Sequence, residues 1–103
     1  SDVEEEAELK SKEDVDTNLT WKGMSFVKEI MQEYGIDDIN KVKPGVGETT
    51  RVLLRRIPWK ILVRDLNDSK IQHILLLAKD LDVPVEVKSE MTYACCGIIK
   101  GAI

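Results

Sequence analysis

The chain has 103 residues, of which 43% are apolar, and a net charge of −4, so it is long enough for one small domain with its own core. It contains no run of about 18 apolar residues, which excludes an ordinary membrane-spanning helix. The two cysteines, Cys95 and Cys96, are neighbours, and this spacing excludes both a disulfide framework and a CxxC metal motif. We therefore expect a cytoplasmic domain, and we assign it no metal and no cofactor.

Charge is distributed unevenly along the chain. Residues 1–19 carry eight acidic side chains against two lysines and show no apolar periodicity, so we expect a disordered acidic tail or linker there. Residues 20–103 carry 13 basic and 11 acidic side chains, a net charge of +2, and form the expected folded domain. A broad basic surface is excluded for such a domain, so any binding of nucleic acid should be local.

The first half of this domain is predicted to alternate between helix and strand. Residues 20–34 have the spacing of an amphipathic helix, and Gly35 ends it. Residues 39–43 alternate apolar with polar side chains, which predicts a short strand. Residues 47–57 are predicted to form the second helix. The side chains expected to face the core are Trp21, Met24, Phe26, Val27, Ile30 and Met31 in the first helix, and Val46, Thr50, Leu53, Leu54 and Ile57 around the second.

The alternation continues to the end of the chain. We predict a strand over 60–64, a helix from a cap at Asn67 or Asp68 to Leu81, and a strand over 84–87. A short helix is expected over 89–96, followed by a last strand over 98–103. This order predicts an α/β fold, a three-layer α/β/α sandwich around a central mixed four-stranded sheet.

A glycine-rich turn, Gly45-Val46-Gly47, leads into the second predicted helix. Backbone amides at the start of a helix attract anions. Glu48, Arg51 and Arg55 follow at spacings of three and four residues, so they share one face of that helix. Arginine side chains fork onto phosphates and base edges, so the pattern predicts RNA binding. A strained turn beside a solvated ion-pair face explains the same residues without a ligand.

Four stretches follow in a distinctive order over residues 38–103: the glycine turn with its Glu48-Thr49-Thr50-Arg51 continuation, the apolar Ile61-Leu62-Val63, a helix ending in Val83-Pro84, and Tyr93-Ala94-Cys95-Cys96-Gly97 before a last strand. Their order and spacing resemble the kink-turn-binding ribosomal-protein superfamily, which includes the pelota-type RNA-binding domains. In that family the turn reads Gly-x-Asn-Glu-x-Thr-Lys. Here Gly47 stands in place of the Asn that reads the kink, and Arg51 in place of the Lys.

The resemblance implies a non-catalytic RNA-binding module for structured or kinked RNA, an accessory domain of a larger protein. It also implies that the loop at the end of the third strand lies beside the glycine turn and holds a nucleotide. We expect a monomer. The predicted RNA-binding residues are Lys43, Gly45, Val46, Gly47, Glu48, Arg51, Arg55, Lys88 and Ser89.

Other chemistry-bearing residues have plainer interpretations. Trp59 can stack a base or pack against the edge of the sheet, and the sequence favours packing. His73 is expected on the surface without a catalytic partner, and Cys95 and Cys96 are expected in the core. Because the chain has no Ser/His/Asp set and no P-loop, we do not expect an enzyme. The alternative is a protein-interaction or regulatory domain on the same fold that has lost RNA binding.

Overall fold

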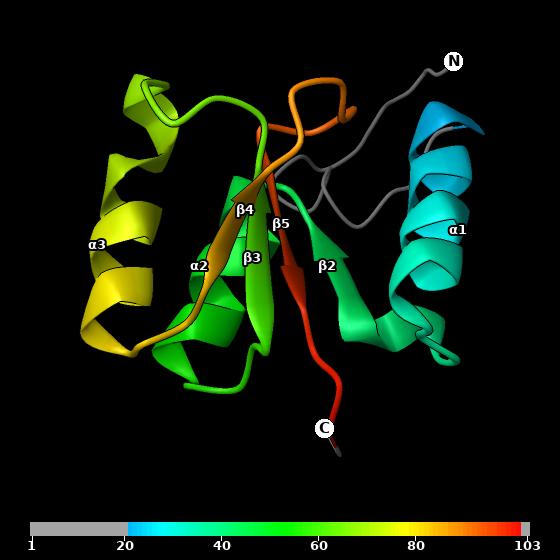
Figure 1. The fold of residues 1–103 in the computed structure, drawn as a ribbon, viewed down its shortest axis with the longest axis horizontal. Coiled ribbons are helices and arrows are strands. Elements are labelled where there is room, and N and C mark those ends of the chain that lie inside the picture. Colours follow the sequence, from blue (N-terminus) through cyan, green and yellow to red (C-terminus); the bar gives the residue numbers. More distant parts are fainter. Residues whose placement is uncertain (1–20, 102–103) are drawn as a thin grey trace.

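The computed structural model describes residues 21–101 (Figure 1), so the predicted acidic tail over 1–19 lies outside the described residues. Within the described part, no helix has the length and apolar character needed to cross a membrane. The elements in chain order are α1 (Trp21–Tyr34), the short 3-10 turn η2 (Ile39–Lys41), β2 (Val42–Pro44), α2 (Val46–Leu54), β3 (Lys60–Val63), the 3-10 turn η3 (Ser69–Ile71), α3 (Gln72–Asp80), β4 (Val85–Val87) and β5 (Cys95–Ile98).

The four strands form one mixed sheet in the order β2-β5-β3-β4. β5 runs antiparallel to both β2 and β3, whereas β3 and β4 are parallel. Helix α1 covers one face of the sheet, and α2 and α3 cover the other (Figure 1). The predicted three-layer α/β/α sandwich with a mixed four-stranded sheet is confirmed.

Alternation along the central strands divides the core into two clusters. Leu62 on β3 packs with α1, whereas its neighbours Ile61 and Val63 pack with α2 and α3. The same alternation sends Cys96 to the α1 side and Cys95 to the other side. Both thiols are fully buried, which confirms their predicted place in the core.

The predicted helix over 89–96 is wrong. Residues 88–94 form an irregular loop whose Met91 side chain is buried, and Cys95 and Cys96 already belong to β5. β5 lies between β2 and β3, so its backbone amides and carbonyls are satisfied on both edges. This pairing outweighs the local helix signals of the segment.

Two boundaries in the first half also differ from the prediction. Residues 39–41 form a 3-10 turn rather than a strand, because the Asp38 carboxylate accepts a hydrogen bond from the Asn40 amide and starts the turn. The strand begins only at Val42. The second helix ends at Leu54, which was predicted to face the core but is exposed. The predicted burial of Leu53 is confirmed, and the other buried residues of the helix are Thr49 and Val52, which were not predicted.

Trp21 was predicted in the core, and this is wrong because the exposed fraction of this residue is 88%. Successive residues of an α-helix are turned by about 100°, which places Trp21 on the side of α1 opposite to the buried Phe26, Val27 and Ile30, so its side chain faces away from the sheet. The apolar stripe of α1 is therefore narrower than predicted, with Phe26, Val27 and Ile30 as its buried residues.

Candidate nucleic-acid interface

Gly45 sets the geometry of the turn before α2. Its backbone has φ 95° and ψ 158°, a conformation that residues with a Cβ rarely adopt. Its amide donates to the carbonyl of Cys95 over 2.9 Å, and its carbonyl accepts the first helical hydrogen bond from the Thr49 amide over 3.0 Å. The backbone amides of Val46 and Gly47 come before this first helical hydrogen bond, so they point out of the N-terminal end of α2 rather than along the helix.

Close packing holds α2 against the sheet. Thr49 is fully buried, and its hydroxyl donates to the carbonyl of Lys43 over 3.2 Å. A Cβ built on Gly97 of β5 would lie 2.9 Å from Val52 Cγ2, which is too short for a real contact. The close approach of α2 to β5 therefore requires a glycine at this position. The start of α2 is thus fixed both by its turn and by its buried face.

The outer face of α2 presents the predicted polar residues. Arg51 Nη2 donates to Glu48 Oε2 over 3.0 Å, and 54% of the Arg51 side chain remains exposed. Arg55, one turn further along, is also exposed. The ion pair shows that Glu48 and Arg51 share one face of α2, and it holds the guanidinium beside the start of the helix.

Thr50 links α2 to α3, and sequence reasoning missed this contact. Its Oγ1 lies 2.7 Å from the carbonyl of Val46 and 2.9 Å from Nε2 of His73. Both contacts are satisfied when the hydroxyl donates to the carbonyl and the imidazole N–H donates to the hydroxyl. His73 is on the surface, as predicted, but it also links α2 to α3. The only local sequence signal for this contact was the pair of adjacent threonines, Thr49 and Thr50, within a helix.

Several loops meet at one end of the sheet. The start of β5 lies at the same end of the sheet as the last residues of β2, β3 and β4, as the strand pairing shows (Figure 1). The glycine turn and the loop with Lys88 and Ser89 therefore share this end. The Lys88 amide donates to the carbonyl of Val63 over 2.8 Å, which places the loop beyond β3.

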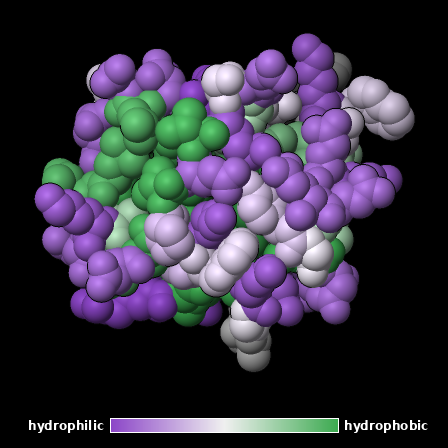
Figure 2. Space-filling model, in the orientation of Figure 1, coloured by the Kyte–Doolittle hydropathy of each residue, from purple (hydrophilic) through white to green (hydrophobic). Residues whose placement is uncertain are grey.

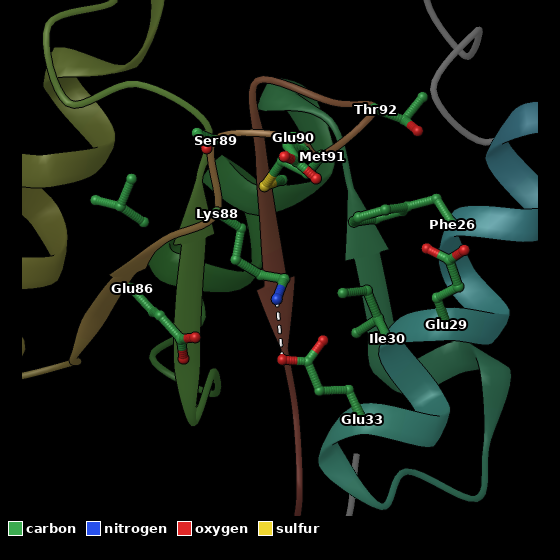
Figure 3. Close-up of a pocket in the computed structure, with 11 residues that line it drawn as sticks. Phe26, Glu29, Ile30, Glu33, Glu86, Lys88, Ser89, Glu90, Met91 and Thr92 are labelled. Carbon is green, nitrogen blue, oxygen red and sulfur yellow. Dashed lines mark hydrogen bonds and ion pairs between the residues drawn. The ribbon is translucent and has the colours of Figure 1, made fainter.

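The Lys88 side chain nevertheless points to the α1 side of the molecule. Its ammonium lies 2.9 Å from Glu33 Oε2 on α1, in a groove of about 440 Å³ between α1 and the 88–92 loop (Figure 3). Glu29, Glu86 and Glu90 also line this groove, so acidic groups outnumber the lysine there. The arginine face of α2 and the surroundings of Lys88 thus differ in charge as well as in position.

A family model described as the PELOTA RNA binding domain matches residues 21–101. The chain belongs to this family. A curated relative, the cysteine protease StiP of Acinetobacter baylyi, is 36% identical over 66 residues. The match covers 64% of this chain and 17% of StiP, so the chain spans only a small part of that relative's length.

The two thiols of this pelota domain have the chemistry of core residues. Burial raises the pKa of the Cys95 thiol to about 11, against an ordinary value of 9.0. Burial also raises the pKa of Cys96, and the neighbouring Cys95 adds to the effect. Both thiols are therefore protonated at neutral pH. Among the described residues, no group of three or more His, Cys, Asp or Glu side chains is arranged to hold a metal ion.

Proposed function

We propose that this pelota domain binds structured RNA through the start and outer face of α2. The observation that carries the proposal is the geometry of Gly45, which directs the first amides of α2 outward beside Arg51. Backbone amides and a guanidinium on one surface are complementary to phosphate oxygens. Membership of an RNA-binding family supports the same interpretation.

Each residue of this face has a distinct proposed role. The amides of Val46 and Gly47 donate to a phosphate, and Arg51 contacts the adjacent phosphate or a guanine edge. Glu48 orients Arg51 or accepts from an exocyclic amine, and Arg55 contacts a phosphate one turn along. Lys43, on the strand before the turn, extends the positive rim.

Kinked RNA is the first shape to test. Gly47 has no side chain to offer a base, so recognition of a kink here has to rely on its backbone amide and on Arg51. Lys88 and Ser89, at the same end of the sheet, remain predicted contacts for a nucleotide that crosses it. For Lys88 this contact requires the ammonium to leave Glu33.

We also propose that the domain is non-catalytic and serves as an accessory part of a larger protein. The buried, protonated thiols are poor nucleophiles, because the thiolate is the reactive form. The chain corresponds to only 17% of the relative named as a cysteine protease, so the name of that relative does not assign a protease activity here. The cytoplasmic setting and the monomeric state stay predictions.

Charge reversal tests the RNA-binding role. In a titration of the full chain into a fluorescently labelled structured RNA, we expect Arg51→Glu to weaken binding at least about tenfold, since a charge-assisted contact is replaced by repulsion. Lys79→Glu makes the same change of charge on exposed α3 and should have little effect. Equal affinities for the two variants would contradict the proposal.

A protein-interaction role is the second candidate, and one surface favours it. Figure 2 shows apolar side chains gathered over α3 and β4, where Leu76 on α3 and Val87 on β4 are exposed. β4 is an edge strand, so a partner could pair beside this surface. Loss of a protein partner in Leu76→Glu, with RNA binding absent in the unaltered chain, would favour this role.

A further inference from the structure

A second aromatic and basic cluster lies at the opposite end of the sheet from the glycine turn. It consists of Tyr34 at the end of α1, Trp59 and Lys60 at the start of β3, and Lys100 just after β5. The amide of Trp59 donates to the carbonyl of Ile98 over 2.6 Å, which ties the Trp59 backbone to the last residue of β5. None of these residues belongs to the face proposed above.

Trp59 is held in place without being buried. It belongs to neither core cluster, and the exposed fraction of the residue is 38%. The ring of Tyr34 meets it edge-on, with centroids 6.1 Å apart and planes at 72°. A tryptophan with only a packing role is normally buried more completely, so the exposed part of this indole is available to a ligand.

Two ammonium groups lie over the indole. Lys100 Nζ is 4.4 Å from the ring centroid and Lys60 Nζ is 4.9 Å from it. Lys60 is also tied to Glu86 by a 3.0 Å ion pair, and this contact holds the pKa of Glu86 below its ordinary value. Among residues 21–101, no carboxylate pairs with Lys100. Within these residues its ammonium is stabilised by the electron-rich face of the Trp59 ring.

We propose that Trp59 and Lys100 form a second RNA contact, in which an unpaired base stacks on the indole and the ammonium holds the phosphate of the same nucleotide. Every base has a π face, so stacking on an aromatic side chain is favourable for any unpaired base. A cation–π contact at an exposed site is weaker than base stacking, so a stacked nucleotide replaces it favourably.

The position of α2 connects this cluster to the first face, and the inference rests on the proposed function. α2 starts at the glycine turn and runs toward the opposite end of the sheet, over roughly 13 Å for nine residues. Arg55 and Arg56 follow its end, and Trp59 comes three residues later. Tyr34 holds the indole on the α1 side of the sheet, whereas α2 lies on the other side, so a strand of RNA that leaves the Arg51 face along α2 has to pass around this end of the sheet to reach the indole.

The test uses Trp59 as its own probe. Trp21→Phe removes the other tryptophan at an exposed position and leaves Trp59 as the sole indole of the full chain. We expect a hairpin RNA with a single-stranded oligoadenosine extension to quench the Trp59 fluorescence, and the hairpin without extension to quench it much less. In the same background, anisotropy of labelled RNA reports total binding.

Substitutions separate stacking from a structural role. Trp59→Ala and Lys100→Gln should each weaken binding of the extended RNA about tenfold and leave the unextended hairpin unchanged. Trp59→Phe keeps an aromatic face and should retain most of the affinity even if the alanine variant folds poorly. Lys79→Gln, an exposed lysine on α3, is the matched control and should have no effect.

The outcomes distinguish this inference from the function on which it rests. Binding that depends on Arg51 but shows no quenching, with unchanged affinity in Lys100→Gln and Trp59→Ala, overturns the second contact and leaves the proposed function standing. Absence of binding to both RNAs overturns the two together. Quenching by the extended RNA that is lost in Trp59→Ala and weakened in Lys100→Gln supports the second contact.

Discussion

Two glycines that are two residues apart in the sequence have different tasks in the structure. Gly45 has a positive φ of 95°, whereas Gly47 lies inside helix α2. We predict that Gly45→Ala lowers the free energy of unfolding by about 1–3 kcal/mol, because alanine is strained in that conformation. Gly47→Ala should cost nothing or add about 0.5–1 kcal/mol, because alanine favours helix.

Urea unfolding of both variants checks this prediction. Equal destabilisation by the two substitutions would mean that the turn is not fixed by the backbone of Gly45. RNA binding of Gly47→Ala then shows separately whether the missing side chain at this position matters for close approach of the ligand.

The buried thiols predict a dependence of stability on pH. In the unfolded chain a thiol ionises near its ordinary pKa of 9.0, whereas the pKa of Cys95 in the fold is about 11. The fold therefore favours the protonated thiol, and its contribution to stability is present below pH 9 and lost as the pH rises toward 11. Urea unfolding at pH 8 and pH 10.5 should show this decrease, and Cys95→Ala should show less of it.

Thiol labelling provides an independent check on the same residues. At pH 8 the native chain should react with a thiol reagent far more slowly than the chain in denaturant, because both thiols are buried and protonated. Rapid reaction of the native protein would contradict the core position of Cys95 and Cys96.

Local spacing decided which single residues were predictable. Gly45 and Arg51 were found because a turn and a helix face are defined within a few positions of the sequence. The contact between Thr50 and His73 joins residues 23 positions apart, so it depends on how α2 and α3 pack. The exposure of Trp21 was missed for a different reason: at about 3.6 residues per turn this position lies opposite to Phe26, Val27 and Ile30, so it did not belong to their stripe.

At the scale of elements, the contact between α2 and β5 positions the whole candidate face. Gly97 leaves room for Val52, and a Cβ there would lie only 2.9 Å from the valine methyl. We predict that Gly97→Ala lowers the free energy of unfolding by about 1–3 kcal/mol and weakens RNA binding, because α2 has to move. Thermal unfolding and an RNA titration measure the two effects.

Gly101 provides the matched control for this substitution. A Cβ at Gly101 would have no heavy atom within 4 Å, so Gly101→Ala should leave both stability and binding near those of the unaltered chain. If Gly97→Ala behaves like Gly101→Ala, then α2 is not held by close packing on β5.

The elements themselves were predicted unevenly. Helix α3 was found because its apolar residues recur at helical spacing and Ile71, Ile74 and Ala78 are indeed buried. Residues 89–96 were assigned to a helix because local signals cannot report that β5 is paired on both edges. The pairing partners of β5, Val42–Pro44 and Lys60–Val63, lie more than 30 residues earlier in the chain.

For the whole molecule, the alternation of helices and strands was sufficient to predict the layers, and four motifs in order were sufficient to predict the family. The distribution of surface character was not predictable. Lys88 reaches an acidic groove on the α1 side, the arginines lie on α2, and apolar side chains gather over α3 and β4. Each of these surfaces combines residues from distant parts of the sequence.

The most direct test of the account compares the full chain on a kink-turn RNA and on a plain duplex of matched length, at 50 and 200 mM salt. We predict tighter binding to the kinked RNA, a loss of roughly 10- to 40-fold in affinity between the two salt concentrations for two or three phosphate contacts, and loss of the preference in Arg51→Glu. Equal binding of both RNAs, or a preference that survives in Arg51→Glu, would contradict local recognition of structured RNA by α2.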